Sequence, residues 1–186
     1  MAKIVVVYHS GFGHTAQVAK AVVRGVELVS DVTVKLITVE EINGDYTALN
    51  EADCIIFGCP TYMGGPSAQF KTFIDAASKV WFVQGWKDKL AAGFTNSGGL
   101  SGDKLNTLNS LFINAMQHGM IWIGNSQMVG GTTPNDINRL SSYTGVMTQS
   151  DRGPAEEFPP AGDLKTAENF AKRVAEITKQ FVKGRG

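Results

Sequence analysis

Apolar and polar residues alternate along this chain in blocks with strand-like and helix-like periods. Short apolar runs rich in β-branched residues are typical of buried strands, which we expect at residues 3–9, 32–38, 53–59, 90–95 and 120–123. Between them, apolar residues recur every three or four positions, which predicts helices over residues 14–29, 67–79, 103–118 and 164–183. Strands that alternate with helices predict an α/β fold, a doubly wound parallel sheet with helices on both faces.

Two segments do not fit this alternation. Residues 40–50 are polar, and we expect a loop with a short helical turn there. Residues 125–160 are rich in Gly, Pro, Asn, Ser and Thr, and a segment of this length is typically a lid, a binding loop or an insertion in a strand. Because nothing in the pattern resembles a linker or a repeat, residues 1–186 are predicted to form a single domain.

Composition argues against several classes of function. The 17 Lys and Arg balance the 17 Asp and Glu, so no net charge attracts nucleic acid or an anionic membrane. No apolar run is long enough to span a bilayer, and the first residues do not resemble a signal peptide. Cys54 and Cys59 have neither a CxxC nor a metal-ligand spacing, so we expect reduced core thiols in a cytoplasmic protein. Cys59 also lies close enough to a strand end to line a site.

Three uncharged loops carry the candidate chemistry, and each directly follows a predicted strand. They span residues 10–15, 60–66 and 95–102, and none contains Lys, Arg, Asp or Glu. Loops at the carboxyl ends of parallel strands converge on one ligand crevice. These loops would offer hydroxyls, backbone N–H groups and close approach, without metal ligands or fixed charges. That chemistry suits a phosphate bound without magnesium and attached to a flat, neutral ring.

The first loop is the candidate phosphate site. A helix that begins there would direct free N–H groups and the positive end of its dipole at an anion. Ser10 and Thr15 would add hydroxyls, while Gly11 and Gly13 permit positive φ. The loop lacks the lysine of a P-loop, and Ala16 stands where a dinucleotide fingerprint needs a third glycine. A glycine-rich structural turn is the alternative interpretation.

The motifs of these loops resemble those of the WrbA-type NAD(P)H:quinone oxidoreductases, which bind FMN and have a flavodoxin-like fold. The matching motifs are Tyr8-x-Ser10-x-x-Gly13-His14, Ile55-Ile56-Phe57-Gly58-x-Pro60-Thr61, Thr72-Phe73-x-Asp75, Trp81, Lys89-Leu90-Ala91 and His118-Gly119-Met120. The resemblance implies a flavodoxin-like, five-stranded parallel sheet with the strand order 2-1-3-4-5. The chain departs from that family after its second predicted strand, where the family has a long insertion, and over residues 124–160.

This resemblance implies that FMN is the cofactor and that NADH or NADPH is the co-substrate. The first loop would hold the FMN phosphate, and the other two loops would clasp the isoalloxazine ring through backbone N–H groups. The cofactor-binding residues implied in this way are Ser10, Gly11, Phe12, Gly13, His14, Thr15, Pro60, Thr61, Tyr62, Met63, Gly64, Thr95, Asn96, Ser97, Gly98 and Gly99.

Three residues are implied on the substrate side of the flavin. Trp81 aligns with a tryptophan that walls the family's pocket, and Phe12 with a position that contacts the nicotinamide. His118 aligns with a histidine that faces the substrate, which makes it the candidate catalytic residue. Met63 stands where that family has an aromatic residue. Taken from the sequence pattern alone, the aromatic residues could pack in a core or interface, and His118 could interact with a helix dipole.

The resulting hypothesis is an enzyme that reduces a quinone or a similar small acceptor by two electrons. Nicotinamide and quinone would share one flavin face, so turnover would be ping-pong. The alternatives are a flavodoxin electron carrier and a non-catalytic FMN-binding module. Carrier flavodoxins are strongly acidic as a family, whereas this chain is neutral. The family also implies a homodimer or homotetramer, which would cover Trp81 and Trp86 if both are exposed.

Overall fold

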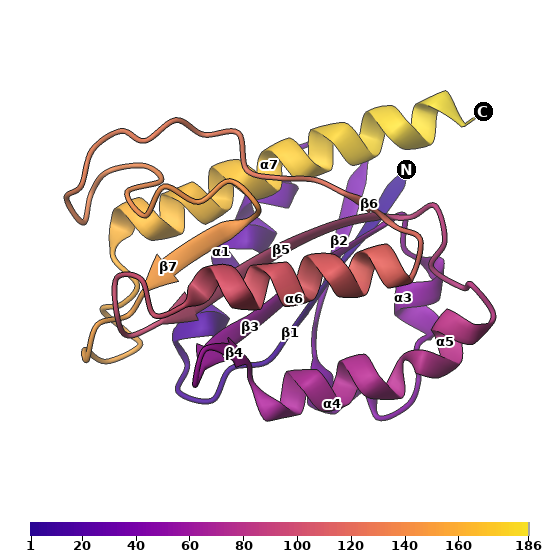
Figure 1. The fold of residues 1–186 in the computed structure, drawn as a ribbon. Coiled ribbons are helices and arrows are strands. Elements are labelled where there is room, and N and C mark those ends of the chain that lie inside the picture. The colour runs from indigo at the N-terminus through magenta and orange to yellow at the C-terminus, as the bar shows by residue number, and fades with distance from the viewer. Residues whose placement is uncertain (186) are drawn as a thin grey trace.

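Strands with near-continuous apolar sequences form the centre of the molecule, as expected for a parallel sheet covered on both faces. In the computed structural model, which describes residues 1–185, the main strands have the order β2-β1-β3-β5-β6 (Figure 1). Their bounds are β1 Ala2–Tyr8, β2 Val32–Thr38, β3 Cys54–Tyr62, β5 Leu90–Ser97 and β6 Ile121–Trp122. The predicted strand order is confirmed.

Two layers of helices cover the sheet (Figure 1). One face packs against α1 and α7, and the other packs against α4, α5 and α6 together with two short helices. The bounds are α1 His14–Glu27, α2 Val39–Ile42, α3 Thr47–Glu51, α4 Ala68–Ala76, α5 Ser78–Phe82, α6 Lys104–Gln117 and α7 Ala161–Gly184. None of the helices among residues 1–185 has the length and apolarity needed to cross a membrane.

The edge strand of the sheet is interrupted. Its first part, β6, pairs with the beginning of β5, and its second part, β7 (Val146–Gln149), pairs with the end of β5. The chain leaves the sheet after β6 and returns to the same edge 24 residues later, at Val146. Of the three interpretations of this irregular region, a strand insertion therefore describes its first part. A short strand β4 (Gly65–Pro66) adds an antiparallel partner to the end of β3.

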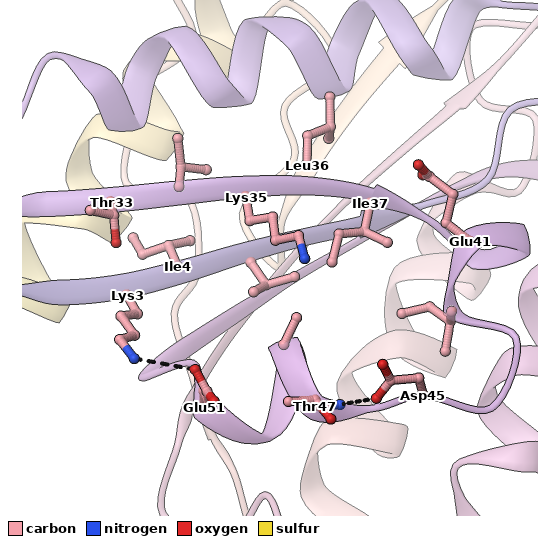
Figure 2. A pocket seen from close by; sticks show the side chains of 14 residues that line it. Lys3, Ile4, Thr33, Lys35, Leu36, Ile37, Glu41, Asp45, Thr47 and Glu51 are labelled. Carbon is pink, nitrogen blue, oxygen red and sulfur yellow. Dashed lines mark hydrogen bonds and ion pairs between the residues drawn. The ribbon is translucent and has the colours of Figure 1, made fainter.

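The segment between β2 and β3 covers the sheet only partly. A capping box at Thr38 starts α2, which ends after four residues, and α3 has only five residues. The result is a groove of about 510 Å³ over β1 and β2 (Figure 2). Some of its polar residues already have partners within the groove. Lys3 Nζ lies 3.3 Å from Glu51 Oε2, and Asp45 Oδ1 accepts a hydrogen bond from the Thr47 N–H. It lies on the flank of the sheet, away from the three uncharged loops.

Candidate functional site

The loops after β1, β3 and β5 meet at the carboxyl edge of the sheet, at the end marked by β4 and β7 in Figure 1. They enclose a cavity of about 250 Å³. The residues that line it are Ser10, Phe12, His14, Thr15, Pro60, Thr61, Tyr62, Asn96, Ser97, Gly98, Ser150 and Asp151. All three expected loops contribute. The last two residues come from a fourth segment, after β7, which the sequence analysis did not include in the site.

The first loop wraps around the beginning of α1. Ser10 Oγ accepts a hydrogen bond from the Ala16 N–H at 3.1 Å, and Gly13 has a φ of +89°. A Cβ atom at Gly11 would lie 2.5 Å from the Tyr62 hydroxyl, so a larger residue there would displace the Tyr62 ring. His14 Nε2 donates to the Gly153 carbonyl at 2.8 Å, which ties the loop to the segment after β7. The start of α1 therefore faces the cavity, where its free N–H groups favour an anion.

The threonines of the second and third loops position the loops. Thr61 Oγ1 lies 2.8 Å from both Thr95 Oγ1 and Thr107 Oγ1. Thr95 Oγ1 also donates to the Cys59 carbonyl at 2.7 Å. Thr95 is fully buried and does not line the cavity. These hydroxyls therefore hold the ends of β3 and β5 at a fixed separation, and only Thr61 borders the space for a ligand.

Exposed apolar side chains surround the mouth of the cavity. Phe12 is 77% exposed and makes an edge-to-face contact with Tyr62, with ring centroids 6.1 Å apart. Met63 is fully exposed in a left-handed conformation, and the next residue, Gly64, accepts a hydrogen bond from Asn106 through its carbonyl. Desolvation raises the pKa of the Tyr62 hydroxyl, which therefore stays a neutral donor. Exposed apolar groups beside a cavity are typical of a surface that binds a ligand.

The third loop is held from behind by two side chains that the sequence analysis did not single out. Gln149 Nε2 donates to the Gly98 carbonyl at 3.1 Å, and Lys104 Nζ donates to the Gly99 carbonyl at 2.6 Å and to Ser97 Oγ at 2.7 Å. The expectation of a site without fixed charges is therefore wrong: the loops are uncharged, but Asp151 lines the cavity and Lys104 is buried behind the third loop. Its only signal in the sequence is an unfavourable cation in the first turn of a helix.

A buried ion pair supports Gln149 in turn. Arg139, from the insertion between β6 and β7, donates to both carboxylate oxygens of Asp163 at 2.7 and 3.1 Å. It also donates to Gln149 Oε1 at 3.0 Å, and Asp163 accepts from the Gln149 backbone N–H at 2.8 Å. Arg139, Gln149 and Asp163 thus form a brace, which connects the insertion and the start of α7 to β7 and the third loop.

The structure does not bring His118 or Trp81 to the cavity. The helix α6 starts at the carboxyl ends of the strands and runs antiparallel to them. His118, at the end of α6, therefore lies at the amino-terminal ends of the strands. There it is 2% exposed and packs against Trp86, with ring centroids 4.4 Å apart. Trp81 lies on α5, which is also at the amino-terminal ends of the strands, on the side of the chain termini in Figure 1. Within one copy of the chain, neither expected substrate-side residue reaches the three loops.

Burial of the His118 ring has a consequence for stability. Desolvation lowers its pKa to about 4, and its Nδ1 has no hydrogen-bond partner among the residues described. The unfolded chain, with an ordinary histidine pKa of about 6.5, binds the proton first as the pH falls. The stabilising contribution is therefore complete above about pH 6.5 and is lost progressively as the pH falls towards 4.

We expect the free energy of unfolding to fall by about 2 kcal/mol between pH 7 and pH 5 because of this one group. Urea unfolding at the two pH values measures the change. A His118→Phe variant, which keeps an aromatic ring against Trp86, should lose that part of the pH dependence. If the free energy of unfolding fell equally between pH 7 and pH 5 in the variant and in the unmodified protein, His118 would not be held neutral.

A model of the NADPH-dependent FMN reductase family matches residues 3–134 of this chain, a region that contains all three loops. The chain belongs to the NADPH-dependent FMN reductase family. This membership confirms the prediction of an FMN-dependent oxidoreductase that uses a nicotinamide co-substrate. The match ends inside the insertion between β6 and β7, so Ser150, Asp151 and the brace at Asp163 lie outside it.

This FMN reductase family member is similar to proteins with two kinds of name. Flavodoxin FldP of Pseudomonas aeruginosa is 40% identical, with 97% of this chain and 99% of that protein covered. An NAD(P)H dehydrogenase (quinone) of Archaeoglobus fulgidus is 32% identical, with 97% and 100% covered. The solved structure of a WrbA-like flavodoxin from Agrobacterium tumefaciens is 42% identical, with a TM-score of 0.76 over 97% of this chain and 99% of that one. The predicted flavodoxin-like fold and WrbA-type resemblance are confirmed.

Proposed function

We propose that this protein holds FMN in the cavity between the three loops and uses NADH or NADPH to reduce a quinone or a similar small acceptor. The observation that carries the proposal is the combination of a cavity lined by the donors of three uncharged loops with the exposed rings of Phe12 and Tyr62 at its mouth. The family match and the relatives named NAD(P)H dehydrogenase (quinone) support the same activity.

The residues of the first loop fit the phosphate of FMN. The beginning of α1 supplies backbone N–H donors, and the hydroxyls of Ser10 and Thr15 line the same space. Gly11 keeps this space open, because any Cβ there would press on Tyr62. The cavity has a single cradle of this kind, which fits one phosphate and therefore FMN rather than FAD. When bound, FMN supplies the redox chemistry by accepting a hydride equivalent and passing two electrons to the acceptor.

The remaining residues would orient the ring and its partner. Pro60, Tyr62 and Gly98 border the cavity on two sides, so a flat ring would lie between the second and third loops. Phe12 and Met63 extend the apolar surface outward from the mouth, where a nicotinamide or a quinone would stack. Because one mouth serves both substrates, the nicotinamide must leave before the quinone binds, which predicts ping-pong turnover.

Electron transfer as a flavodoxin carrier is the second candidate, and one observation favours it. A relative named flavodoxin, FldP, is more similar to this chain than the NAD(P)H dehydrogenase (quinone) of Archaeoglobus fulgidus, at 40% against 32% identity. A carrier would bind FMN in the same loops but would exchange electrons with a protein partner. The neutral charge of this chain, with 17 basic and 17 acidic residues, gives less electrostatic attraction to such a partner.

Cofactor analysis combined with one assay separates the candidates. The purified protein should release FMN, and not FAD, on mild acid treatment. The FMN-loaded protein should oxidise NADH or NADPH when benzoquinone is present. An FMN-loaded protein that oxidises neither nicotinamide would reject the enzyme in favour of the carrier or of a flavin-binding module. A protein that cannot be reconstituted with FMN would reject the site itself.

We also propose that the chain forms a homodimer or homotetramer. On and after α5, Trp81, Phe82 and Val83 are 42%, 81% and 71% exposed, which is an unusual apolar surface for a monomer. Trp86, expected to share this surface, is instead fully buried, with its Nε1 bonded to Asn50. Light scattering at micromolar concentration should give at least twice the chain mass, and a monomer mass would reject the proposal.

We also propose that the protein is located in the cytoplasm. Cys54 and Cys59 are both free and buried, and burial raises the pKa of each thiol to about 12. Such thiols are inert and unpaired, as is usual in a reducing compartment. Cys59 does not line the cavity, so it has no role there.

A further inference from the structure

Lys104 is a charged residue in a place where charge is costly. It is the first residue of α6 and is fully buried. Lysine is almost never fully buried unless it is paired, because the ammonium loses its hydration. The positive end of the α6 dipole adds to this cost. A position that is unfavourable in both respects calls for a reason beyond packing.

No carboxylate contacts Lys104 among residues 1–185. Its Nζ donates to Ser97 Oγ and to the Gly99 carbonyl, which uses two of the three N–H donors of an ammonium. The Asp163 carboxylate acts on the pKa of Lys104 through its charge, but it is already bound by Arg139. Desolvation lowers the pKa of Lys104 to about 8, so the side chain remains mainly charged at neutral pH. The protein therefore keeps an incompletely compensated positive charge directly behind the third loop.

The hydrogen bonds of Lys104 also set the direction of the loop's peptide groups. The Gly99 carbonyl points to the buried Lys104 Nζ, and the Gly98 carbonyl points to Gln149 Nε2. In a trans peptide the N–H points opposite to the C=O, so the N–H groups of Gly99 and Leu100 point away from these two donors. Both residues lie on the exposed side of the loop, next to Gly98 at the cavity wall. Two backbone donors are thus oriented before any ligand arrives.

We propose, building on the FMN function above, that Lys104 is a positioning residue that fixes the N–H donors of the third loop and raises the affinity of the site for reduced FMN relative to oxidised FMN. Reduction adds negative charge to the pyrimidine part of the flavin ring, and a positive charge near that part tunes the flavin. In a poorly hydrated interior such a charge acts strongly. Of the residues that line the cavity, only Asp151 carries a full charge at neutral pH, and that charge is negative.

The test compares the affinity of the apo-protein for the two forms of FMN. Anaerobic titrations with oxidised and with dithionite-reduced FMN would be made on the unmodified protein, on Lys104→Met and on Lys104→Gln. The Met variant keeps the apolar stem without charge or donor, and the Gln variant restores a neutral donor. Lys89→Met is the matched control, because Lys89 also donates two hydrogen bonds, to carbonyls at 2.7 and 2.6 Å, but lies directly before β5, at the opposite end of the strand from the third loop.

We expect Lys104→Met to raise the Kd for reduced FMN at least tenfold more than the Kd for oxidised FMN. For a two-electron couple, that ratio lowers the midpoint potential of the bound flavin by about 30 mV. Lys104→Gln should recover affinity for oxidised FMN while keeping the lower potential, and Lys89→Met should leave the ratio of the two Kd values unchanged.

Two results would overturn the proposal. Equal changes in both Kd values for Lys104→Met would show that Lys104 only holds the loop, and a normal ratio in Lys104→Gln would show that its charge is irrelevant. These outcomes leave the proposed function intact, because the unmodified protein still binds FMN. An unmodified protein that binds neither form of FMN would instead reject the proposed function, and this role of Lys104 with it.

Discussion

Removing two hydroxyls from the first loop, in a Ser10→Ala/Thr15→Val variant, is expected to weaken FMN binding by about a hundredfold or more. Each hydroxyl bonded to a charged phosphate contributes roughly 1.5–3 kcal/mol, and neighbouring contributions do not add strictly. Thr15→Val is nearly isosteric, so it removes the bond without opening a cavity. Titration of the apo-protein with FMN, followed by the quenching of flavin fluorescence, gives the Kd of each variant.

The control for this prediction is a buried threonine far from the loops. Thr178 in α7 donates to the Val174 carbonyl at 2.7 Å, and Thr178→Val should leave the Kd for FMN unchanged. Ser10 also accepts from the Ala16 N–H, so Ser10→Ala removes an acceptor from the first turn of α1, which costs about 1 kcal/mol of stability. The single Thr15 variant therefore carries the cleaner test. If it binds FMN as tightly as the unmodified protein, the phosphate does not lie at the start of α1.

The second large effect is expected at the brace behind the third loop. Arg139→Met should lower the free energy of unfolding by about 3–5 kcal/mol, because it leaves the Asp163 carboxylate buried without its cation. The two side chains are 6% and 2% exposed, so water cannot replace the lost partner. Chemical denaturation at neutral pH measures the loss, which is a large part of the about 5–15 kcal/mol typical of a domain.

A double variant separates the buried charge from the loss of packing. Arg139→Met/Asp163→Asn removes the stranded charge but keeps an acceptor for the Gln149 N–H, so it should be more stable than Arg139→Met alone. A single variant within about 1 kcal/mol of the unmodified protein, or a double variant no better than the single one, would contradict the structural role of this pair.

The sequence pattern was sufficient to predict a parallel sheet with helices on both faces and the convergence of the three loops, which follow from the alternation of strands with helices and from the general rule for parallel sheets. The strand order came from the family resemblance. The same rule also bears on His118. A helix that begins at the carboxyl ends of the strands must finish near their amino-terminal ends. A residue at the end of such a helix therefore cannot lie in the three loops of the same copy. The resemblance suggested a role for His118 that the topology of a single chain does not support.

Other features of the site have no periodic signal in the sequence. The brace joins Arg139, Gln149 and Asp163 from an insertion, a short strand and a helix start, and only tertiary packing brings them together. The direction of the Lys104 side chain likewise depends on the backbone just before it. Gly102 and Asp103 both have positive φ, at +53° and +55°, which turns the chain at the end of the third loop. Sequence spacing places Lys104 near the loop but cannot show that it points inward.

We propose that one FMN site both accepts electrons from a nicotinamide and passes them to a quinone. Steady-state rates of the FMN-loaded protein, measured over a grid of NADPH and benzoquinone concentrations, test it most directly. NADPH oxidation should be matched one to one by quinone reduction, with parallel double-reciprocal lines as the quinone concentration changes. Intersecting lines would contradict the shared mouth of the cavity, and an FMN-loaded protein without NADPH or NADH oxidation would contradict the enzyme itself.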